Sequence, residues 1–496
     1  MRIVLLIAVA LFVADVAGVD LANADERAAL KGALAPDVVT TVPAPERKGE
    51  DWPCFLGSRG TGECAETNWL KKWPEDGPEV AWQKRIGTGY SAPSVMGNRL
   101  VVHHRPRDED IIDCLRADNG EPLWRFTYPT EYQDRYGYNN GPRCTPLLTK
   151  NRVFTLNAEG KLFCLDLISG KQVWGRDCAK DFRIPDDENF FGVGCTPILE
   201  GNLLIVFVGG QPNSGVVAFN SENGDVVWQN VGKSTWDGAE MGDSGKAKYR
   251  WSGKESIYSY STPLAATIHG RRQILCFLRH GLVSLDPKDG VVNFKYWFRP
   301  RIRDSVNAAR PVVIDNKIFL SAAYELGSVL LQVQPSGKEV KVLWKDGDNM
   351  LTHWSTAMHI DGYLYGFSGR HEYEGELRCL DLKTGDVRWK TPDFEKNSAK
   401  IIRSPITGEI KDADGKAIFG RGSKIQLGDR FLVLGEWGTL ALVKVRPDKF
   451  EELGRRSVPG IKYPAWAAPV LSRGRVYLRS ETHLVCLDLA EKSDTK

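Results

Sequence analysis

KLFCLDLISGKQVW, residues 161–174, has the pattern of one β-hairpin. Apolar residues suited to strands stand on both sides of a polar turn, and Gly170 gives that turn the positive φ that other residues resist. The spacing recurs along the chain: glycine follows a small residue after six positions, and an aromatic residue follows it after ten. The copies begin at Cys114, Cys164, Ala218, Ser284 and Cys379. Fixed offsets at a period of about 40 to 50 residues predict a propeller or a related repeat array.

A second recurring pattern precedes each copy and completes the repeat. A small residue and a proline, as in Cys144-Thr145-Pro146, lead through a tight polar turn such as Lys150-Asn151 into another apolar strand. Each repeat therefore predicts four antiparallel strands. Eight repeats can be traced, and the seventh, from Ser423 to Leu442, is weak and lacks its tryptophan. If that weak copy is an insertion, the propeller has seven blades instead.

The two ends of the chain complement one another. The eighth repeat, which contains Val476-Tyr477-Leu478, ends before its tryptophan strand, whereas Glu79-Val80-Ala81-Trp82 has the pattern of a fourth strand with no repeat before it. Pairing these two segments closes the ring and removes the open sheet edges. We therefore predict an all-β fold, an eight-bladed β-propeller of four-stranded antiparallel blades closed by its N- and C-terminal strands.

The first residues predict export. Met1 and Arg2 precede an apolar run from Ile3 to Val13, as in a secretory signal, and the candidate cleavage sites follow Ala22-Asn23-Ala24 or, alternatively, Val16-Ala17-Gly18. The run is short for a membrane span. We expect a periplasmic or extracellular protein with no transmembrane segment in the mature chain, with an uncleaved anchor as the alternative. The predicted organisation is a signal peptide 1–24, a tether with a small disulfide loop 25–75, the propeller 76–490 and a tail 491–496.

The cysteines and the charge balance limit the possible partners. Four of the ten cysteines, Cys114, Cys164, Cys379 and Cys486, occupy one repeat position, which also accepts Ala218 and Ser284 and is therefore a small core position. Cys54 and Cys64 bracket a glycine-rich loop outside the repeats, which suits a disulfide in an oxidising compartment. Lys and Arg number 66 against 63 Asp and Glu, so no field over the whole chain attracts nucleic acid or a membrane surface.

The blade pattern of Leu-Asp, then Ser or Thr with Gly, then Trp resembles the repeat of the pyrroloquinoline-quinone (PQQ) type β-propellers. The resemblance covers Val80 to Leu489. That family includes quinoprotein alcohol dehydrogenases and an outer-membrane assembly lipoprotein, so the resemblance implies a fold more strongly than a function. It also implies that indole rings pack between neighbouring blades as a structural girdle, formed by Trp82, Trp124, Trp174, Trp228, Trp344 and Trp389.

The residues just before each first strand are expected to ring the mouth of the central channel, because first strands are innermost in a propeller. The ring contains Tyr90, Arg143, Gly194, Tyr260, Arg310, Trp354 and Trp466, with Arg421 near the weak seventh copy. The long segments between repeats emerge on the same face, as does the loop from second to third strand, and such loops carry function. Guanidinium and aromatic groups at a concave mouth suit a planar anionic ligand. A wet, unoccupied pore is the alternative.

Enzymatic chemistry has little support in the sequence. The resemblance to quinoprotein dehydrogenases implies a bound quinone, a calcium ion held by carboxylate and amide oxygens, an aspartate base and commonly two adjacent cysteines, and no Cys-Cys pair occurs. Asn307 and Glu325 match no calcium motif. His103-His104 and His371-Glu372 lack the spacing of a zinc site and are expected at the surface. We predict no catalytic residue, no metal and no cofactor, with PQQ and calcium as the alternative.

These patterns favour an exported propeller that acts as a scaffold for protein interaction or ligand binding through its long-loop face. Trp236 and Trp251, in the long segment after the third repeat, are predicted to contact a partner. We expect that partner to be an envelope protein or a small anionic ligand rather than nucleic acid, and we expect the protein to be a monomer. The alternative function is a PQQ- and calcium-dependent alcohol or sugar dehydrogenase.

Overall fold

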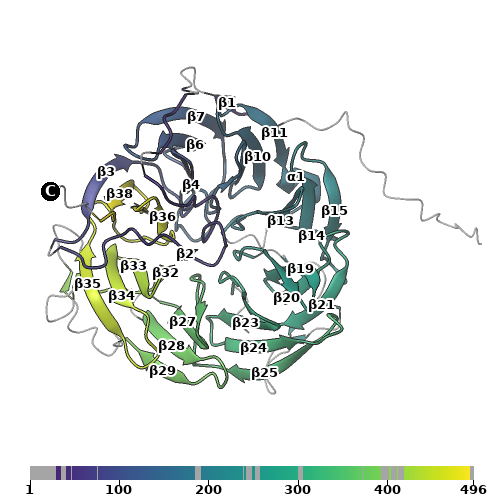
Figure 1. The fold of residues 1–496 in the computed structure, drawn as a ribbon. Helices are drawn as coiled ribbons and strands as arrows, with labels where there is room; N and C mark the ends of the chain where they lie inside the picture. Colours follow the sequence, from purple (N-terminus) through teal and green to yellow (C-terminus); the bar gives the residue numbers. More distant parts are fainter. Residues whose placement is uncertain are drawn as a thin grey trace, which may run out of the picture.

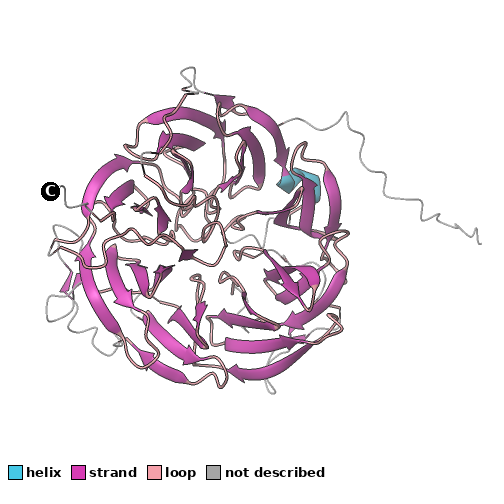
Figure 2. Cartoon of the chain, in the orientation of Figure 1, coloured by secondary structure: helices cyan, strands magenta, loops and turns pink. Residues whose placement is uncertain are grey.

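Eight antiparallel sheets stand around a central axis like the blades of a propeller (Figure 1), as the sequence predicts. The computed structural model describes residues 30–491 except 35–38, 40, 46, 75, 185–190, 238–239, 242–248, 252–256, 258, 300–304, 372–373, 392–401, 404–409 and 412–417. The predicted signal peptide 1–24 and the tail beyond residue 491 lie outside the described residues. Nearly all regular structure is strand (Figure 2), and no described helix is long and apolar enough to cross a bilayer.

Each blade runs from an inner to an outer strand in chain order, except that the outer strand of blade 8 comes from the N-terminal segment. Blade 1 consists of β4 (Ser94–Met96), β5 (Arg99–His104), β6 (Glu109–Arg116) and β7 (Pro122–Pro129). Blade 2 consists of β8 (Leu147–Leu148), β9 (Arg152–Leu156), β10 (Lys161–Asp166) and β11 (Gln172–Asp177). Blade 3 consists of β12 (Ile198–Glu200), β13 (Leu203–Gly210), β14 (Ser214–Asn220) and β15 (Val226–Asn230). Blade 4 consists of β18 (Leu264–Ile268), β19 (Arg271–Leu278), β20 (Gly281–Leu285) and β21 (Val292–Trp297).

The remaining blades follow the same plan. Blade 5 consists of β22 (Val312–Ile314), β23 (Lys317–Ala322), β24 (Gly327–Val333) and β25 (Val340–Asp346). Blade 6 consists of β26 (Met358–Ile360), β27 (Tyr363–Ser368), β28 (Glu376–Asp381) and β29 (Val387–Lys390). Blade 7 consists of β32 (Gly422–Leu427), β33 (Arg430–Gly435), β34 (Thr439–Lys444) and β35 (Glu451–Ser457). Blade 8 consists of β36 (Val470–Ser472), β37 (Arg475–Arg479), β38 (His483–Asp488) and the N-terminal β3 (Glu79–Arg85).

Short elements lie outside the regular blades. One-turn helix α1 (Cys178–Phe182) follows blade 2, and β1 (Ala33–Leu34) adds a fifth, antiparallel strand to the outer edge of blade 1. Two small ribbons, formed by β16 (Glu240–Met241) with β17 (Tyr249–Arg250) and by β30 (Ile402–Arg403) with β31 (Ile410–Lys411), decorate long segments between blades.

The ring is closed by its two ends. Strand β3 pairs antiparallel with β38, with Trp82 opposite Cys486. The weak seventh copy is a complete blade, so the structure has eight blades and not seven. In blade 7 the position of the missing tryptophan is taken by Gly454, which lies opposite Leu442. A Cβ atom on Gly454 would lie 3.2 Å from the ring of Trp73, so an indole from the N-terminal segment covers this position.

The six girdle tryptophans connect six of the eight blades to the next blade, and blades 4 and 7 have Phe294 and Gly454 at this position. Each indole N–H donates to a backbone carbonyl of the following blade, for example from Trp124 to Leu167 at 3.0 Å and from Trp174 to Ser221 at 3.0 Å. The other four donate over 2.8 to 3.2 Å: Trp82 to Ala117, Trp228 to Pro287, Trp344 to Leu382 and Trp389 to Arg446. The hairpin glycine of the next blade lies beneath five of the rings. A Cβ atom on Gly170, for example, would lie 2.6 Å from the Trp124 ring.

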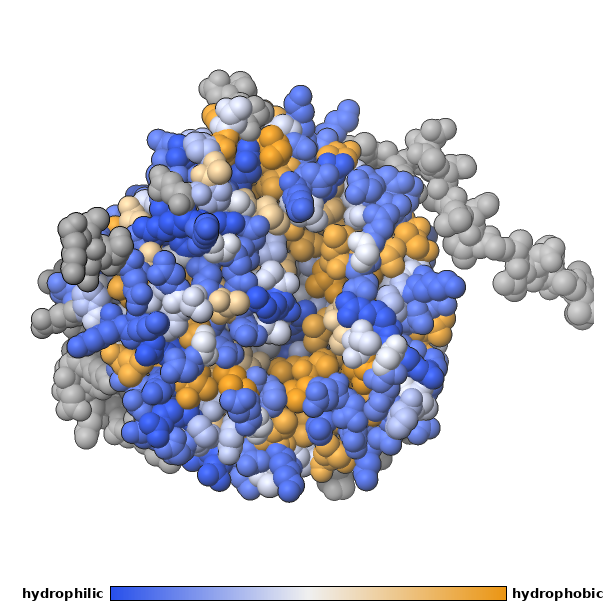
Figure 3. Space-filling model, viewed as in Figure 1, coloured by the Kyte–Doolittle hydropathy of each residue, from blue (hydrophilic) through white to orange (hydrophobic). Residues whose placement is uncertain are grey.

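The core lies between blades. The middle strands are buried on both faces, and β13, with sequence LLIVFVGG, is buried at every position except the first. Such strands read as continuous apolar runs, because neighbouring sheets cover both of their faces. On the face seen in Figure 3, polar residues dominate the circumference and apolar residues gather around the middle.

Residues 52–64, which we call the plug, cross one end of the central channel. Its strand β2 (Glu63–Cys64) pairs in parallel with β32 of blade 7, and Trp52 forms a β-bridge with Val95 of blade 1. The plug also contacts blade 2, because the N–H of Leu148 donates to the Pro53 carbonyl at 2.7 Å. The plug therefore joins inner strands on different sides of the ring.

The disulfide predicted between Cys54 and Cys64 is wrong, because both thiols are free in the structure. The Cys54 Sγ donates to the Gly57 carbonyl at 3.1 Å, and this residue packs against the core between blades 2 and 3. Cys64 belongs to the core that blades 7, 8 and 1 share. The two ends of the glycine-rich loop thus pack into different parts of the ring.

Candidate functional site

A cavity of about 470 Å³, which we call the cup, opens on the channel axis. The segments before the first strands of all eight blades contribute to its wall, and Phe55 of the plug closes it from within the channel. Its lining is dominated by aromatic side chains: Phe55, Tyr90, Tyr136, Tyr138, Phe191, Tyr260, Tyr324, Trp354 and Trp466. A largely apolar concave site of this size suits a small ligand or one end of a larger one.

Seven of the eight residues predicted around the channel mouth line the cup: Tyr90, Arg143, Gly194, Tyr260, Trp354, Arg421 and Trp466. The register of the repeats therefore brings these residues together. What they bind stays a prediction.

Arg310 is not at the mouth, and that prediction is wrong. Its guanidinium Nη1 donates to the Gly60 carbonyl in the plug, and its backbone N–H donates to the Thr356 hydroxyl at 3.2 Å. Burial lowers the pKa of Arg310 to about 10. The plug covers this side chain, and nothing in the repeat pattern indicates that a segment from outside the repeats enters the channel.

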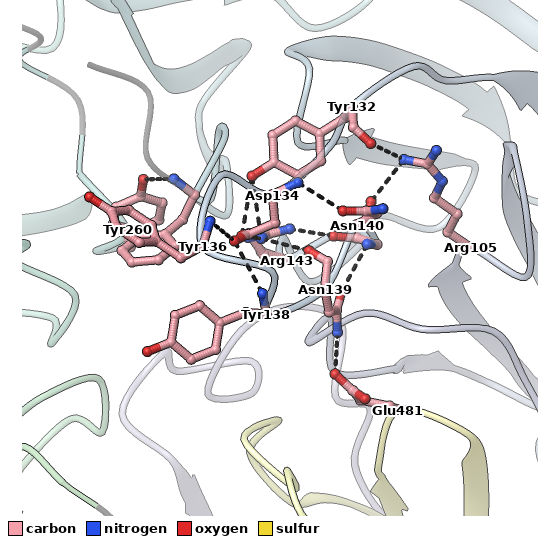
Figure 4. A network of polar contacts seen from close by, with 12 residues as sticks. Arg105, Tyr132, Asp134, Tyr136, Tyr138, Asn139, Asn140, Arg143, Tyr260 and Glu481 are labelled. Carbon is pink, nitrogen blue, oxygen red and sulfur yellow. Dashed lines mark hydrogen bonds and ion pairs between the residues drawn. The ribbon is translucent and has the colours of Figure 1, made fainter. Parts of the chain in front are cut away.

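Arg143 is held by a network around Asp134 (Figure 4). Its Nη2 donates to Asp134 Oδ2 at 2.6 Å and to the Asn139 carbonyl at 2.9 Å, while Nη1 donates to the Gly141 carbonyl at 2.6 Å. The guanidinium also lies 5.8 Å from the centre of the Tyr90 ring. The buried Asp134 carboxylate compensates the charge of Arg143, so this arginine supports the loop rather than offering a free cation.

Arg421 is compensated in the same way. Its Nη2 donates to Glu436 Oε2 at 2.7 Å, and its backbone N–H donates to Glu436 Oε1 at 2.7 Å. The Trp466 indole donates to the same carboxylate at 2.9 Å, and the guanidinium lies 4.6 Å from the centre of the Trp354 ring. Burial raises the pKa of Glu436, which Arg421 opposes by favouring the carboxylate form. The expectation that Arg143, Arg310 and Arg421 together attract an anion therefore loses its physical basis.

The cation that the cup does offer is Arg370, which the sequence analysis missed. This residue follows β27, and its guanidinium lies 4.4 Å from the centre of the Tyr324 ring. No described residue accepts a hydrogen bond from that guanidinium, and none forms an ion pair with it. The signal that could have identified it is its place in the loop from second to third strand, which faces the same way as the mouth.

Next to Arg370, His353 stays neutral. Burial and the neighbouring Arg421 hold the pKa of His353 well below its usual value. Its Nε2 lies 3.1 Å from the Tyr324 hydroxyl and its Nδ1 lies 3.1 Å from Arg421 Nη1. Since an arginine can only donate, His353 Nδ1 accepts, and the Nε2 proton is donated to Tyr324. Histidine thus adds no positive charge to the wall of the cup at this position.

The surface position expected for the histidine pairs is only partly correct. His103 and His104 are buried and not at the surface, with His103 Nε2 at 2.9 Å from the Tyr128 hydroxyl and His104 Nε2 at 3.1 Å from Asp113. His371 is exposed, whereas Glu372 lies outside the described residues.

Trp236 and Trp251 do not form an exposed partner surface. Both are buried and pack against the His280 ring, with centroids 6.4 and 4.6 Å away. The long segment after blade 3 therefore folds back on the turn between β19 and β20. Its tryptophans belong to the core.

The described residues around the cup supply no set of ligands for the calcium ion of a quinoprotein dehydrogenase. No group of three or more His, Cys, Asp or Glu side chains in the described part of the chain could hold a metal ion. The acidic residues next to the cup, Asp134 and Glu436, are bound to Arg143 and Arg421. Asn307 donates from Nδ2 to the backbone carbonyl of Leu278 at 2.9 Å, and its Oδ1, the atom that would ligate calcium, is buried without a hydrogen-bond partner among the described residues.

The fold and the repeat define a PQQ-like β-propeller. The model of the family described as outer membrane protein assembly factor BamB matches residues 107–391, which is more than half of the chain, and the chain belongs to that family.

Similar proteins fall into two groups. BamB from Yersinia pestis is 22% identical over 252 residues, covering 48% of this chain and 53% of the relative. The quinoprotein alcohol dehydrogenase PedH from Pseudomonas putida is 27% identical over 122 residues, covering 24% of this chain and 18% of the relative. The matches thus span about half or less of the length of these relatives.

Solved structures show the same fold at low identity. BamB from Moraxella catarrhalis has a TM-score of 0.54 at 12% identity, covering 83% of this chain and 100% of the other. The quinohemoprotein alcohol dehydrogenase from Comamonas testosteroni has a TM-score of 0.59 at 12% identity, covering 90% and 82%. Both an assembly factor and dehydrogenases therefore share this architecture, so the site must decide the function.

Proposed function

We propose that this protein is an exported, non-enzymatic scaffold that binds a ring-bearing anionic ligand in the cup. The observation that carries the proposal is the cup itself: a one-ended aromatic cavity that holds a single uncompensated guanidinium, Arg370, among its described residues. Aromatic faces favour flat rings, and a guanidinium at a partly dry wall favours an anionic group. Export is supported by the pattern at residues 1–24 and by membership of the family described as an outer membrane protein assembly factor.

A defined panel of small molecules tests this proposal. Ring-bearing anions, including PQQ, aromatic carboxylates and acidic sugars, are compared with neutral counterparts by thermal shift and calorimetry on the purified protein. A variant that fills the cup, Ala468→Trp, places an indole where a small side chain now lines the cavity. Lys150→Trp is the control, because it adds the same side chain at an exposed turn between β8 and β9.

We expect at least one anion of the panel to stabilise the wild type and the Lys150→Trp control but not Ala468→Trp. Equal stabilisation of all three proteins would place binding outside the cup and contradict the proposal. The dehydrogenase alternative requires calcium-dependent uptake of PQQ together with dye reduction by an alcohol or sugar, and the panel includes that assay.

A second candidate is an interaction with an envelope protein, which membership of the BamB family favours. The structural observation in its favour is the pair of exposed tyrosines at the rim of the cup, Tyr136 and Tyr138, which are 47% and 54% exposed. A pull-down from envelope extract with the wild type and the Tyr136→Ala/Tyr138→Ala variant tests it. A partner that both proteins retain equally would not bind through this rim.

A further inference from the structure

The rim of the cup carries a rigid aromatic pair. Tyr136 and Tyr138 lie on the loop between β7 and β8, and they are the most exposed aromatic side chains among the described large hydrophobic residues. The loop is nevertheless fixed from within: Asp134 Oδ1 accepts from the N–H groups of Tyr136 at 2.9 Å and Tyr138 at 3.2 Å (Figure 4). Exposed rings on a pre-ordered loop favour recognition of a ligand, because little conformational entropy is lost on binding.

Several backbone N–H groups of this loop already donate to side-chain oxygens within the loop. The Asp134 N–H donates to Asn140 Oδ1 at 2.8 Å, and the Gly141 N–H donates to Asn139 Oδ1 at 2.8 Å. Together with the Tyr136 and Tyr138 N–H groups, these donors are satisfied inside the loop. A peptide that binds as an added strand needs free main-chain partners, and these four N–H groups are not free. The loop presents side-chain faces instead.

The aromatic rings continue from the rim into the cup. On one side the Tyr136 ring lies 5.4 Å from Phe191, which lies 5.6 Å from Tyr260. On the other side the Tyr138 ring lies 5.9 Å from Trp466, which lies 5.4 Å from Trp354. Tyr136 and Tyr138 also line the cup, but they are 47% and 54% exposed, so a single flat molecule inside the cup would cover only part of the rim pair. A chain of several rings would cover both the cup and the rim.

We infer, on the basis of the proposed function, that the ligand is an acidic oligosaccharide whose end enters the cup beside Arg370 and whose following sugar rings lie on Tyr138 and Tyr136. A sugar ring offers an apolar C–H face to an aromatic ring and hydroxyl groups to amphipathic tyrosines. The anionic group, a carboxylate or a sulfate, suits the guanidinium of Arg370. Arg143 and Asp134 are positioning residues, since they hold the rim loop through Tyr138 and Gly141 without offering a free charge.

Calorimetry of the full chain with three trimers tests this inference. The probes are a galacturonate trimer, a sulfated galactose trimer and a neutral galactose trimer. Tyr136→Ala/Tyr138→Ala removes the rim pair, and Val342→Ala/Leu343→Ala on β25 is its control, because those side chains are exposed to a similar extent, at 41% and 40%. Arg370→Gln removes the cation, and Arg388→Gln on the exposed strand β29 of the same blade is its control.

We expect at least one acidic trimer to bind about tenfold or more tightly than the neutral trimer, since a charge-assisted contact adds to affinity. Arg370→Gln should remove that difference, and the rim variant should weaken acidic binding by about tenfold. Both controls should bind as the wild type does. Preference for the uronate or for the sulfate identifies the anionic group, and either result supports the inference.

Several results would overturn it. Equal affinity for neutral and acidic trimers, or unchanged affinity in Arg370→Gln, removes the role of the charge. Unchanged affinity in the rim variant would show that the sugar rings do not lie on Tyr136 and Tyr138. If no trimer binds while an aromatic carboxylate or a peptide binds and Ala468→Trp blocks it, the saccharide assignment fails and the proposed function stands. If Ala468→Trp blocks no ligand, the proposed function itself fails.

Discussion

Replacing Lys424 by methionine should stabilise the protein in a pH-dependent way. Lys424 lies on β32, is 2% exposed, and donates from Nζ to the Thr356 carbonyl at 3.2 Å. Burial lowers the pKa of this amine from 10.5 to about 7. No described carboxylate forms an ion pair with it. The folded protein must therefore bury a poorly solvated charge or release its proton.

The size and sign of the effect follow from linkage. Between pH 7 and 10.5 the unfolded chain binds the proton more tightly than the folded chain, so stability rises with pH in that window. Lowering the pKa from 10.5 to about 7 gives, at about 1.4 kcal/mol for each pKa unit, a full penalty of roughly 5 kcal/mol at low pH. About 4 kcal/mol of this penalty remains at pH 7, and it vanishes above pH 10.5. Losing the hydrogen bond to Thr356 costs about 1 kcal/mol in return. Lys424→Met should thus gain ~3 kcal/mol at neutral pH.

Urea unfolding followed by circular dichroism at pH 6, 8 and 10 measures this difference. Lys383→Met, in an exposed turn of blade 6, is the control and should change little at any pH. A stability gain that shrinks as pH rises supports the reasoning. A difference between Lys424→Met and wild type that is constant with pH, or a loss of stability at pH 6, would refute it.

Three other substitutions test the packing. Gly170→Ala places a Cβ 2.6 Å from the Trp124 ring at φ +70° and should cost about 1 to 3 kcal/mol in urea unfolding, whereas Gly201→Ala, with φ +59° and nothing within 4 Å, should lose only the backbone part. Trp73→Ala should cost about 3 to 5 kcal/mol, and a loss below 1 kcal/mol would contradict its role over Gly454. Burial raises the pKa of Asp110 to about 6, so its carboxylate destabilises the fold as pH rises from 3.8 through 6. Asp110→Asn should raise the thermal midpoint at pH 8 and leave it nearly unchanged at pH 4; the opposite order would contradict this sign.

The repeat made the fold predictable because the same glycine and tryptophan positions serve both the hairpin turn within a blade and the contact with a neighbouring blade. The glycine of KLFCLDLISGKQVW forms the hairpin turn and also makes room for Trp124 of the preceding blade. The tryptophan at the end of the same stretch then donates to Ser221 in the next blade. Because this spacing is present in several blades, the number of blades and the closure of the ring at Trp82 could be inferred from the sequence.

Features that occur once could not be inferred in this way. The plug and Trp73 belong to the N-terminal segment, which has no repeat, and only the structure shows that they enter the channel and blade 7. Arg310 was misplaced for the same reason, because the plug covers it. The burial of Trp236 and Trp251 depends on how one long segment folds back onto His280, which its composition does not indicate.

The site was predictable in position but not in charge. Register alone places Arg143 and Arg421 around the axis, since each precedes the first strand of its blade. Their partners Asp134 and Glu436 come from a long loop and from a turn between strands, and no spacing connects them to the arginines. The sequence therefore suggested that Arg143 and Arg421 are free cations, although both are paired with carboxylates. It gave no sign that Arg370 lies in the wall of the cup without an ion-pair partner among the described residues.

A structure of the full chain with an acidic trimer bound tests the central claim most directly. We predict that the anionic group lies within hydrogen-bond distance of the Arg370 guanidinium, that the first sugar ring occupies the aromatic cup, and that later rings cover Tyr138 and Tyr136. A trimer located on the plug face or along an outer blade edge, with the cup empty, would contradict the account.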